Sequence, residues 1–324
     1  MFFRRGVQSL DIVNLQNHKP IAFKTRSNGK LLLTGEYFVL EGAVALSIPL
    51  KWGQSMKVTE SSGSDLRWKT LDQNGEKWFE CTLNLIDFSI EKTTDDKKAV
   101  FIQQLIKSAS QLNSDFLSKW KKYKVECKLE FNPEWGLGSS STLIANLATW
   151  AELSPFELFF DTQNGSGFDV ASAIADSPIL YSKGEEELTF EEVDLNKELL
   201  EKSYVFYQGK KANSRAEVQK WKNSARKIKA KDIKEISSIS EQLAECNSIK
   251  SYIELIDQHE KLVQSFLEID SITQKYADFN GGMKSLGAWG GDFGLAVHED
   301  PEYTKAFLEK HNFDAVFSLK DIVL

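Results

Sequence analysis

The alternation of apolar and polar residues is clearest between residues 123 and 131. Every second side chain there is apolar, at Tyr123, Val125, Cys127, Leu129 and Phe131, and Lys or Glu stands between them. This period of two predicts a β-strand with one buried and one wet face. Apolar runs at residues 30–34 and 45–50 predict two further strands, and Asp72-Gln73-Asn74-Gly75 predicts the turn of a hairpin over residues 65–85. The first third of the chain is therefore largely β.

Helical spacing of apolar residues begins near Lys98 and continues to residue 120, and alanines give a small-residue face to a predicted helix over residues 142–153. Residues 214–276 are almost wholly helical in pattern. A last helix is expected near residues 302–311, and strands are expected at residues 179–181, 204–207, 294–297 and 315–319. The pattern predicts a two-domain α+β protein with a join near residue 200 and an N-terminal extension over residues 1–19.

Composition narrows the class of protein. The 324 residues are 41% hydrophobic, and 40 Lys and Arg stand against 47 Asp and Glu. The formal charge of -7 and the absence of a long basic stretch argue against nucleic acid as a partner. No run approaches the ~20 apolar residues of a spanning helix, so no membrane partner is expected. Three separated cysteines, Cys81, Cys127 and Cys246, form no metal-binding cluster and predict reduced, buried thiols in a cytoplasmic protein.

The segment Gly136-Leu137-Gly138-Ser139-Ser140-Ser141 lies between the predicted strand and the alanine-rich helix. Glycines let the backbone approach a ligand, and the free N–H groups at a helix N-terminus attract phosphate. The hydroxyls add donors and, at Ser140, a candidate magnesium ligand. The loop is not the P-loop of nucleotide hydrolases, since no Lys-Ser or Lys-Thr follows its glycines. A serine-capped helix after a tight turn would give the same letters, so the loop alone leaves both interpretations open.

Four segments in sequence order resemble motifs of the GHMP kinases, the superfamily of galactokinase and of homoserine, mevalonate and phosphomevalonate kinases. Residues 133–140, Pro-Glu-Trp-Gly-Leu-Gly-Ser-Ser, resemble its PxxxGLGSS loop, which wraps the ATP phosphates. Residues 28–42 resemble the first motif in the Gly-Glu-Tyr form of phosphomevalonate kinases. Residues 285–294 resemble the third motif, with Trp289 replacing a glycine. Residues 165–171, Gly-Ser-Gly-Phe-Asp-Val-Ala, resemble the SGxD segment of the mevalonate branch and are nearer still to the GYDIA-type bacterial GHMP kinases.

This resemblance implies the two-domain GHMP kinase fold. Residues 20–200 would form an N-terminal ATP-binding domain like domain 2 of ribosomal protein S5, and residues 201–324 a ferredoxin-like C-terminal domain. It also implies ATP and Mg²⁺ as cofactors, with residues 136–141 around the phosphates. The expected partners are ATP and a small-molecule acceptor, and the expected assembly is a monomer or homodimer.

Lys30 and Asp169 are the predicted catalytic residues. Phosphoryl transfer requires mainly positioning and charge neutralisation, which a lysine, a carboxylate near the acceptor and a phosphate loop can supply. An ammonium next to Asp169 would keep the carboxylate ionised and offset charge on the transferred group. The alternatives are that Lys30 ends a strand in solvent and that Asp169 caps the helix over residues 170–175. The resemblance favours the catalytic interpretation.

The resemblance also suggests residues for the acceptor. These are Glu36 and Tyr37 in the first motif, Lys210, Ser214 and Arg215 after the predicted strand at residues 204–207, and Gly287, Ala288, Trp289 and Gly290 in the third motif. Cationic residues there could grip an anionic acceptor. Two of these groups also have a purely structural interpretation, a turn-capping carboxylate for Glu36 and an exposed basic turn for Lys210 to Arg215.

The pattern departs from the family at one place. Mevalonate kinases carry a metal-binding Glu one helical stretch before SGxD, and Leu158 stands at that distance here, with Glu157 and Asp161 nearby. The second magnesium ligand is therefore unassigned. The four histidines, His18, His259, His298 and His311, lie outside the motifs and receive no catalytic role.

The sequence thus favours an ATP-dependent kinase that phosphorylates a hydroxyl or a phosphate of a small anionic acceptor, with mevalonate and phosphomevalonate the first candidates. Two alternatives stay open. One is an enzyme like diphosphomevalonate decarboxylase, which shares the fold and releases carbon dioxide. The other is a non-catalytic binding protein, which would be expected to have decayed motifs, whereas Lys30, Ser140 and Asp169 are all present.

Overall fold

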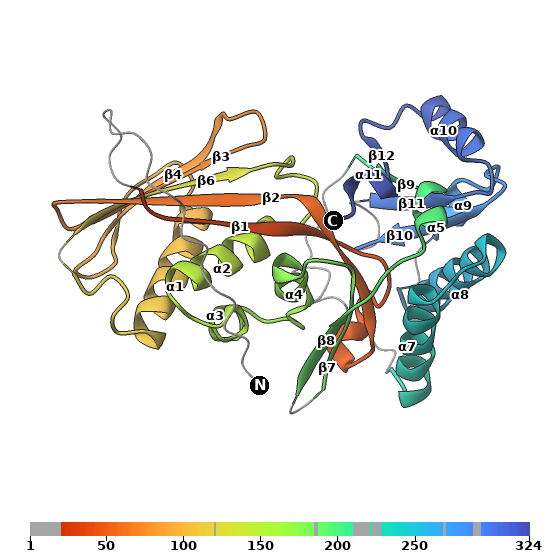
Figure 1. The fold of residues 1–324 in the computed structure, drawn as a ribbon, viewed down its shortest axis with the longest axis horizontal. Helices are drawn as coiled ribbons and strands as arrows, with labels where there is room; N and C mark the ends of the chain where they lie inside the picture. Colours follow the sequence, from red (N-terminus) through yellow and green to blue (C-terminus); the bar gives the residue numbers. More distant parts are fainter. Residues whose placement is uncertain are drawn as a thin grey trace.

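The computed structural model describes residues 21–119, 121–184, 187–209, 221, 228–267, 270–287 and 293–324. These residues form two β-sheets that lie side by side along the long axis of the molecule, each with its own helices (Figure 1). The larger sheet belongs to the first two thirds of the chain and the smaller one to the last third.

The larger sheet has eight strands among the described residues, in the order β5-β4-β3-β6-β2-β7-β8 with β1 paired to β2. They are β1 (Ile21–Leu32), β2 (Ala45–Ser61), β3 (Asp65–Leu71), β4 (Lys77–Asn84), β5 (Ile90–Thr93), β6 (Lys122–Leu129), β7 (Ile179–Lys183) and β8 (Leu188–Glu192). Strands β3 and β6 run parallel, and the other pairs are antiparallel. The long strand β2 carries β1 along one edge and both β6 and β7 along the other.

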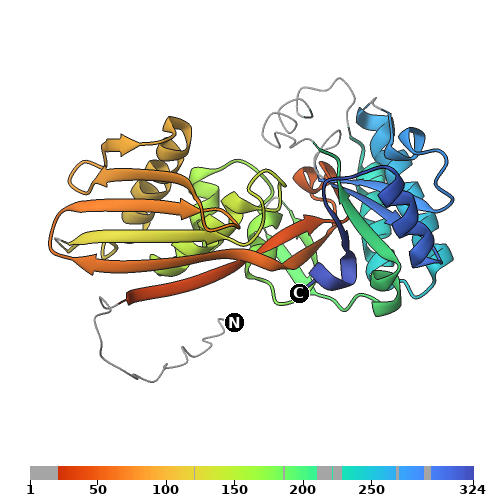
Figure 2. The same cartoon turned by 90° about the horizontal axis from the view of Figure 1, so that it is seen from above.

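Four helices pack on one face of this sheet (Figures 1 and 2), namely α1 (Asp96–Leu112), α2 (Ser139–Trp150), α3 (Pro155–Thr162) and α4 (Phe168–Ile174). Apolar side chains of α1 and α2 meet those of β3, β4 and β6 in one buried cluster around Trp68 and Leu105. The alternation that predicts β6 is confirmed, because Val125, Cys127 and Leu129 are buried while Lys124 and Lys128 are exposed. All three cysteines are buried and free, as expected.

The smaller sheet has the antiparallel order β10-β11-β9-β12, from β9 (Ser203–Tyr207), β10 (Gly282–Leu286), β11 (Phe293–Val297) and β12 (Val316–Ser318). Helices α7 (Ala230–Ala244), α8 (Ile249–Leu267) and α9 (Ile272–Lys275) lie between β9 and β10 in sequence, and α10 (Pro301–Lys310) lies between β11 and β12. This βαββαβ arrangement is ferredoxin-like. Two further short helices are α5 (Lys197–Glu201) before β9 and α11 (Leu319–Ile322) at the end of the chain. The predicted α+β fold class is confirmed.

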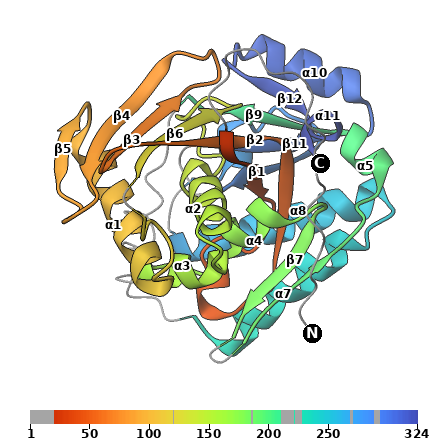
Figure 3. The same cartoon turned by 60° about the vertical axis from the view of Figure 1, so that its left-hand side comes forward.

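The two halves share one hydrophobic core. It joins side chains of β1 and β2, such as Leu31 and Ile48, to side chains of the smaller sheet and of α8, such as Leu295 and Ile256. Helix α7 lies beside β7 and the short helix η1 (Phe38–Glu41), as Figure 3 shows. The end of the chain also crosses the junction, because Val323 pairs with Leu50 of β2.

Several predicted boundaries differ from the structure. Helix α1 ends at Leu112 rather than near residue 120. The next residue, Asn113, has an extended conformation, and its side chain donates to the Ala151 carbonyl. Helix α2 begins three residues before the predicted position 142, at Ser139, because Gly138 occupies the N-cap. The long helical region is divided into α7, α8 and α9 where it is described. Among the described helices, none combines the length and apolar character that membrane crossing requires.

Candidate active site

The glycine loop makes a tight passage from β6 into α2. Gly136 and Gly138 both have positive φ, 70° and 93°, a conformation that side chains with a Cβ rarely adopt. A Cβ on Gly138 would lie 2.9 Å from Oγ of Ser141 and 3.1 Å from Cγ of Lys30. The loop therefore needs glycine at residue 138 for both its backbone conformation and its space.

The glycine loop ends at the N-terminus of α2, where the first backbone N–H groups have no acceptor within the helix. Gly138 is the N-cap of α2, and no side chain caps the helix. The first N–H groups of a helix have no partner within it and favour an anion. Ser140 in the first turn is exposed, whereas Ser141 is buried and donates its hydroxyl to the Gly138 carbonyl at 2.9 Å. This end of α2 has the properties of a phosphate site.

Buried polar contacts fix α2 and α4 against the strands. On α2, Thr142 donates to Oε1 of Gln54 at 2.8 Å, and the Asn146 amide donates to the Gln54 carbonyl at 2.8 Å. On α4, the Ser172 hydroxyl lies 2.7 Å from that of Ser47. All five side chains are buried, so each helix has a defined position on β2.

Lys30 connects the glycine loop to Asp169. Its backbone N–H donates to the Leu137 carbonyl at 3.0 Å, and its Nζ lies 2.9 Å from Oδ1 of Asp169. The ammonium also lies 5.2 Å from the centre of the Phe168 ring. The Lys30 side chain is 13% exposed and that of Asp169 is 35% exposed, so the pair opens to solvent on the carboxylate side. The predicted meeting of these two side chains is confirmed.

Asp169 stands in the first turn of α4 and does not cap it. The N-cap is Gly167, with φ 89°, and it makes no side-chain cap hydrogen bond. The Tyr181 hydroxyl donates to the Ser166 carbonyl and so holds the segment before the helix. Burial, with the nearby Asp169 carboxylate, raises the pKa of Tyr181, which keeps this hydroxyl protonated as a donor. The capping interpretation of Asp169 is therefore wrong.

Glu36 of the first motif lies in a buried ionic cluster. Its Oε1 accepts from Nζ of Lys284 on β10, 248 residues away, and both side chains are almost fully buried. Its Oε2 lies 3.2 Å from Nε2 of His259 on α8. The Gly35 N–H donates to the same nitrogen at 3.0 Å, so Nε2 is an acceptor and the ring is neutral. The Glu36 carboxylate is therefore paired with Lys284 of the smaller sheet.

Glu260 completes the cluster from the side of α8. Its carboxylate accepts from the backbone N–H groups of Ser285 and Ile272, at 3.0 and 3.2 Å, and from the Ser285 hydroxyl. Burial raises the pKa of Glu36 to about 7 against the opposing effect of Lys284, and it raises the pKa of Glu260 as well. Burial, together with Lys284, lowers the pKa of His259 well below 6.5.

Solved structures of small-molecule kinases resemble this chain over 91% of its length. The Streptococcus pneumoniae phosphomevalonate kinase in complex with phosphomevalonate and AMPPNP is 18% identical, with a TM-score of 0.67 over 91% of this chain and 99% of that one. The Methanococcus jannaschii mevalonate kinase is 16% identical, with a TM-score of 0.64 over 91% and 96%. A protein from Listeria innocua is 18% identical, with a TM-score of 0.69 over 91% and 98%. The chain has the GHMP kinase fold. No family model and no curated protein matches the sequence.

Of the predicted acceptor residues, the structure describes Glu36, Tyr37 and Gly287. Glu36 and Tyr37 are 1% and 7% exposed, and Tyr37 stacks on Trp221 at 4.8 Å. Gly287 follows β10 with φ 70°. The remaining predicted acceptor residues lie outside the described residues: Lys210, Ser214, Arg215, Ala288, Trp289 and Gly290.

Sequence reasoning did not single out Lys284 and His259. Lys284 directly precedes the third motif, and its burial inside β10 was not signalled by its residue type. His259 and Glu260 fall on the apolar face of α8 together with Leu255, Ile256 and Val263. Polar residues on the apolar face of an amphipathic helix were the available signal.

The glycine loop is also shorter than the family form. Two residues, Glu134 and Trp135, separate Pro133 from Gly136, where PxxxGLGSS has three. The match to the PxxxGLGSS loop of the GHMP kinases is therefore complete only from Gly136 onward.

The second magnesium ligand stays unassigned. Leu158 is fully buried, while Glu157 is exposed and Asp161 accepts from the Ser108 hydroxyl at 2.6 Å. The described residues contain no group of three or more His, Cys, Asp or Glu side chains that could hold a metal. Mg²⁺ usually keeps several waters and needs only one or two protein ligands beside substrate phosphates. The exposed Ser140 hydroxyl fits that limited donor set.

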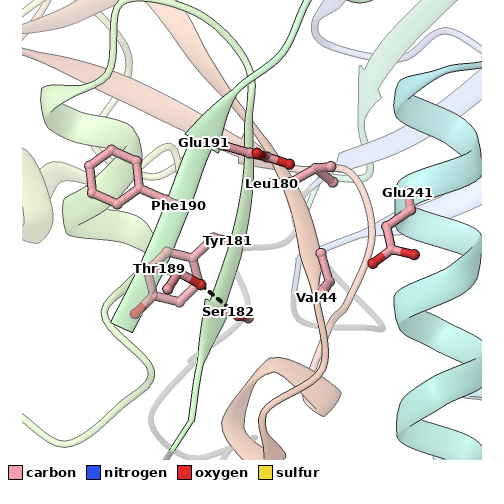
Figure 4. A pocket seen from close by; sticks show the side chains of 8 residues that line it. All are labelled: Val44, Leu180, Tyr181, Ser182, Thr189, Phe190, Glu191 and Glu241. Carbon is pink, nitrogen blue, oxygen red and sulfur yellow. Dashed lines mark hydrogen bonds between the residues drawn. The ribbon is translucent and has the colours of Figure 1, made fainter. Parts of the chain in front are cut away.

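A pocket of about 320 Å³ lies between the β7–β8 hairpin and α7 (Figure 4). Its lining is Val44, Leu180, Tyr181, Ser182, Thr189, Phe190, Glu191 and Glu241. The charged side chains of this lining are both carboxylates, which disfavour a nucleotide phosphate. We therefore place the candidate active site at Lys30, Asp169 and the start of α2 rather than in this pocket.

Proposed function

We propose that this protein is an ATP-dependent kinase that transfers the γ-phosphoryl group of ATP to a hydroxyl or a phosphate of a small anionic acceptor of the mevalonate or phosphomevalonate kind. The observation that carries the proposal is the Lys30–Asp169 ion pair at 2.9 Å, next to the glycine loop. The Lys30 side chain thus connects the candidate phosphate site at Gly138 to Asp169, the candidate acid-base residue.

The roles follow from the positions of the groups. The N–H groups at the start of α2 would bind the phosphates, and Lys30, beside Gly138, would offset negative charge on the transferred group. Asp169 would orient the acceptor hydroxyl and accept its proton. With a phosphate acceptor, the proton transfer is not needed and Asp169 would act by orienting Lys30. Ser140 would be a ligand of Mg²⁺, which would neutralise charge on the ATP phosphates when bound.

The similar structures support the substrate class. One of them contains phosphomevalonate together with AMPPNP, an analogue of ATP. For this chain the acceptor is a proposal, as are the acceptor residues Glu36, Tyr37, Lys210, Ser214, Arg215 and the 287–290 segment. The burial of Glu36 and Tyr37 favours an indirect role for these two, by holding the first-motif loop.

The domain assignment is part of the same proposal. Residues 20–200 would be the ATP-binding domain and residues 201–324 the second domain, and the larger sheet ends at Glu192 while the smaller sheet begins at Ser203. A cytoplasmic location remains an expectation from the reduced cysteines.

The test is a phosphorylation screen. The purified protein is incubated with Mg-ATP and a panel that includes mevalonate, phosphomevalonate and related hydroxy and phospho acids, while ADP and carbon dioxide release are measured. We expect ADP release with at least one acceptor and no carbon dioxide. Carbon dioxide release would indicate the decarboxylase alternative. Nucleotide binding without turnover on any acceptor would favour the non-catalytic alternative.

The Asp169→Asn variant tests the site. We expect kcat with a hydroxyl acceptor to fall about 100-fold or more, with ATP affinity changed less than about threefold, because the glycine loop is intact. The matched control is Asp278→Asn, since Asp278 is an exposed carboxylate paired with Lys310 on the second domain. If Asp169→Asn retains the kcat of the control variant, Asp169 has no part in the mechanism.

A further inference from the structure

The glycine loop is held from outside by an aromatic cluster. Trp135, in the loop directly before Gly136, lies with its ring centre 5.4 Å from Phe317 on β12 and 6.0 Å from Phe293 on β11. It also lies 6.5 Å from Tyr207 on β9 and 6.2 Å from Trp52 on β2. Three of these four partners belong to the smaller sheet.

A hydrogen bond reinforces the same contact. The Tyr207 hydroxyl donates to the carbonyl of Glu134, the residue before Trp135, at 3.3 Å. On the other side of the loop, the Lys30 backbone of β1 donates to Leu137 at 3.0 Å. The loop is thus fixed between β1 of the larger sheet and the aromatic face of the smaller sheet.

The loop cannot supply this rigidity itself. Gly136 and Gly138 have no side chains to pack, and glycine loses more conformational freedom on ordering than any other residue. Trp135 is the large side chain adjacent to them, and its half-buried ring contacts the shared core of both sheets. Aromatic pairs at these separations are favourable beyond the burial of their area. A rigid loop presents its N–H groups to phosphate without a further ordering cost.

We propose that Trp135 is a positioning residue, through which the smaller sheet holds the glycine loop in the conformation that binds the phosphates of ATP. The proposal rests on the proposed function of the loop. It adds a structural dependence, in which nucleotide affinity in one domain requires aromatic side chains of the other.

The test is nucleotide affinity in two variants, Trp135→Leu on the loop and Phe317→Leu on β12. Each is measured by calorimetry with AMPPNP and Mg²⁺. We expect the Kd to rise about tenfold or more in Trp135→Leu and about threefold or more in Phe317→Leu, because each loses aromatic pairs that hold the loop. Phe317 is informative because it lies on the smaller sheet, outside every phosphate-binding segment.

Two matched controls separate positioning from general stability. Trp150→Leu removes a half-buried tryptophan at the far end of α2, where the ring packs on Phe116 and Tyr123. Phe313→Leu removes a half-buried phenylalanine that packs on Phe206, on the other face of the smaller sheet. We expect both controls to bind AMPPNP within about twofold of the unchanged protein, at a comparable loss of Tm.

The outcomes are distinct. Weaker binding in Trp135→Leu and Phe317→Leu than in their controls supports the proposal. Equal binding in all four variants overturns it while leaving the kinase proposal intact. Absence of AMPPNP binding in the unchanged protein overturns both. If Trp135→Leu does not fold, Phe317→Leu against Phe313→Leu decides the question.

Discussion

Gly138 carries a constraint that can be tested directly. Replacing it by valine would put a Cβ 2.9 Å from Oγ of Ser141 and 3.1 Å from Cγ of Lys30, in a backbone with φ +93°. The loop must then open, and its N–H groups would move away from the phosphates. We expect Gly138→Val to weaken ATP binding at least about tenfold, measured by calorimetry on the folded variant.

Gly75→Val is the control for backbone strain alone. Gly75 has φ +82° in the β3–β4 turn, and a Cβ there would meet nothing within 4 Å. Both substitutions impose a positive φ on valine, which costs roughly 1–2 kcal/mol of stability. Only the substitution at residue 138 should change ATP affinity. Unchanged ATP affinity in folded Gly138→Val would remove the phosphate-loop assignment.

Glu36 predicts a specific pH dependence of stability. Its pKa is raised from 4.5 to about 7 in the folded protein, so the folded state binds a proton more tightly than the unfolded chain. This contribution is fully present below pH 4.5 and is lost as the pH rises through about 7. Relative to Glu36→Gln, which does not titrate, the protein should lose stability on the order of 3 kcal/mol over this window.

Urea unfolding of both proteins between pH 4.5 and 8 measures the difference. Gln is a suitable replacement because its oxygen can accept from Lys284 and its NH₂ group can face Nε2 of His259. The pKa of His259 is lowered, which acts in the opposite direction with pH, and His259 is present in both proteins. A difference in stability that does not change with pH would show that Glu36 keeps an ordinary pKa.

Local patterns predicted the elements well where the pattern is short and regular. Strand β6 follows from its alternation, and the hairpin of β3 and β4 follows from its turn residues. The start of α2 was placed three residues late because the apolar spacing begins after the serines, while the N-cap is a glycine with positive φ. Periodicity locates the buried face of an element better than its first residue.

In the candidate site, too, the sequence predicted some features and not others. The glycine loop and the Lys30–Asp169 pair were predicted, because motif order places their segments in one family pattern. The partners of Glu36 and Trp135 were not, since Lys284 is 248 residues from Glu36 and the aromatic contacts of Trp135 come from three strands of the other sheet. No period or motif within one segment encodes which side chains of a distant sheet will meet it.

The two halves of the molecule are connected by packed side chains and hydrogen bonds as well as by the chain itself. One core includes side chains of β1, β2, α8 and the smaller sheet, and the C-terminal Val323 pairs with Leu50. Ser237 and Ser240 of α7 also hydrogen-bond to the backbone of Val44, the residue directly before β2. These contacts predict that the two domains unfold together, because neither retains a complete core when the other is removed.

The buried pair of Lys284 and Glu36 tests this coupling, since each domain contributes one charge. Lys284→Met removes the only described cation of the cluster and leaves the carboxylates of Glu36 and Glu260 buried without it. We expect a loss of about 3–5 kcal/mol in the free energy of unfolding, the usual cost of breaking a buried ion pair from one side. Lys310→Met, which breaks an exposed pair, should cost less than about 1 kcal/mol.

Urea unfolding followed by circular dichroism and by tryptophan fluorescence should give one coincident transition in each variant. Adding Glu36→Gln to Lys284→Met should recover part of the loss, because one orphaned carboxylate is removed. Separate transitions for the two probes, or a loss no larger than that of Lys310→Met, would mean that this pair does not couple the two domains.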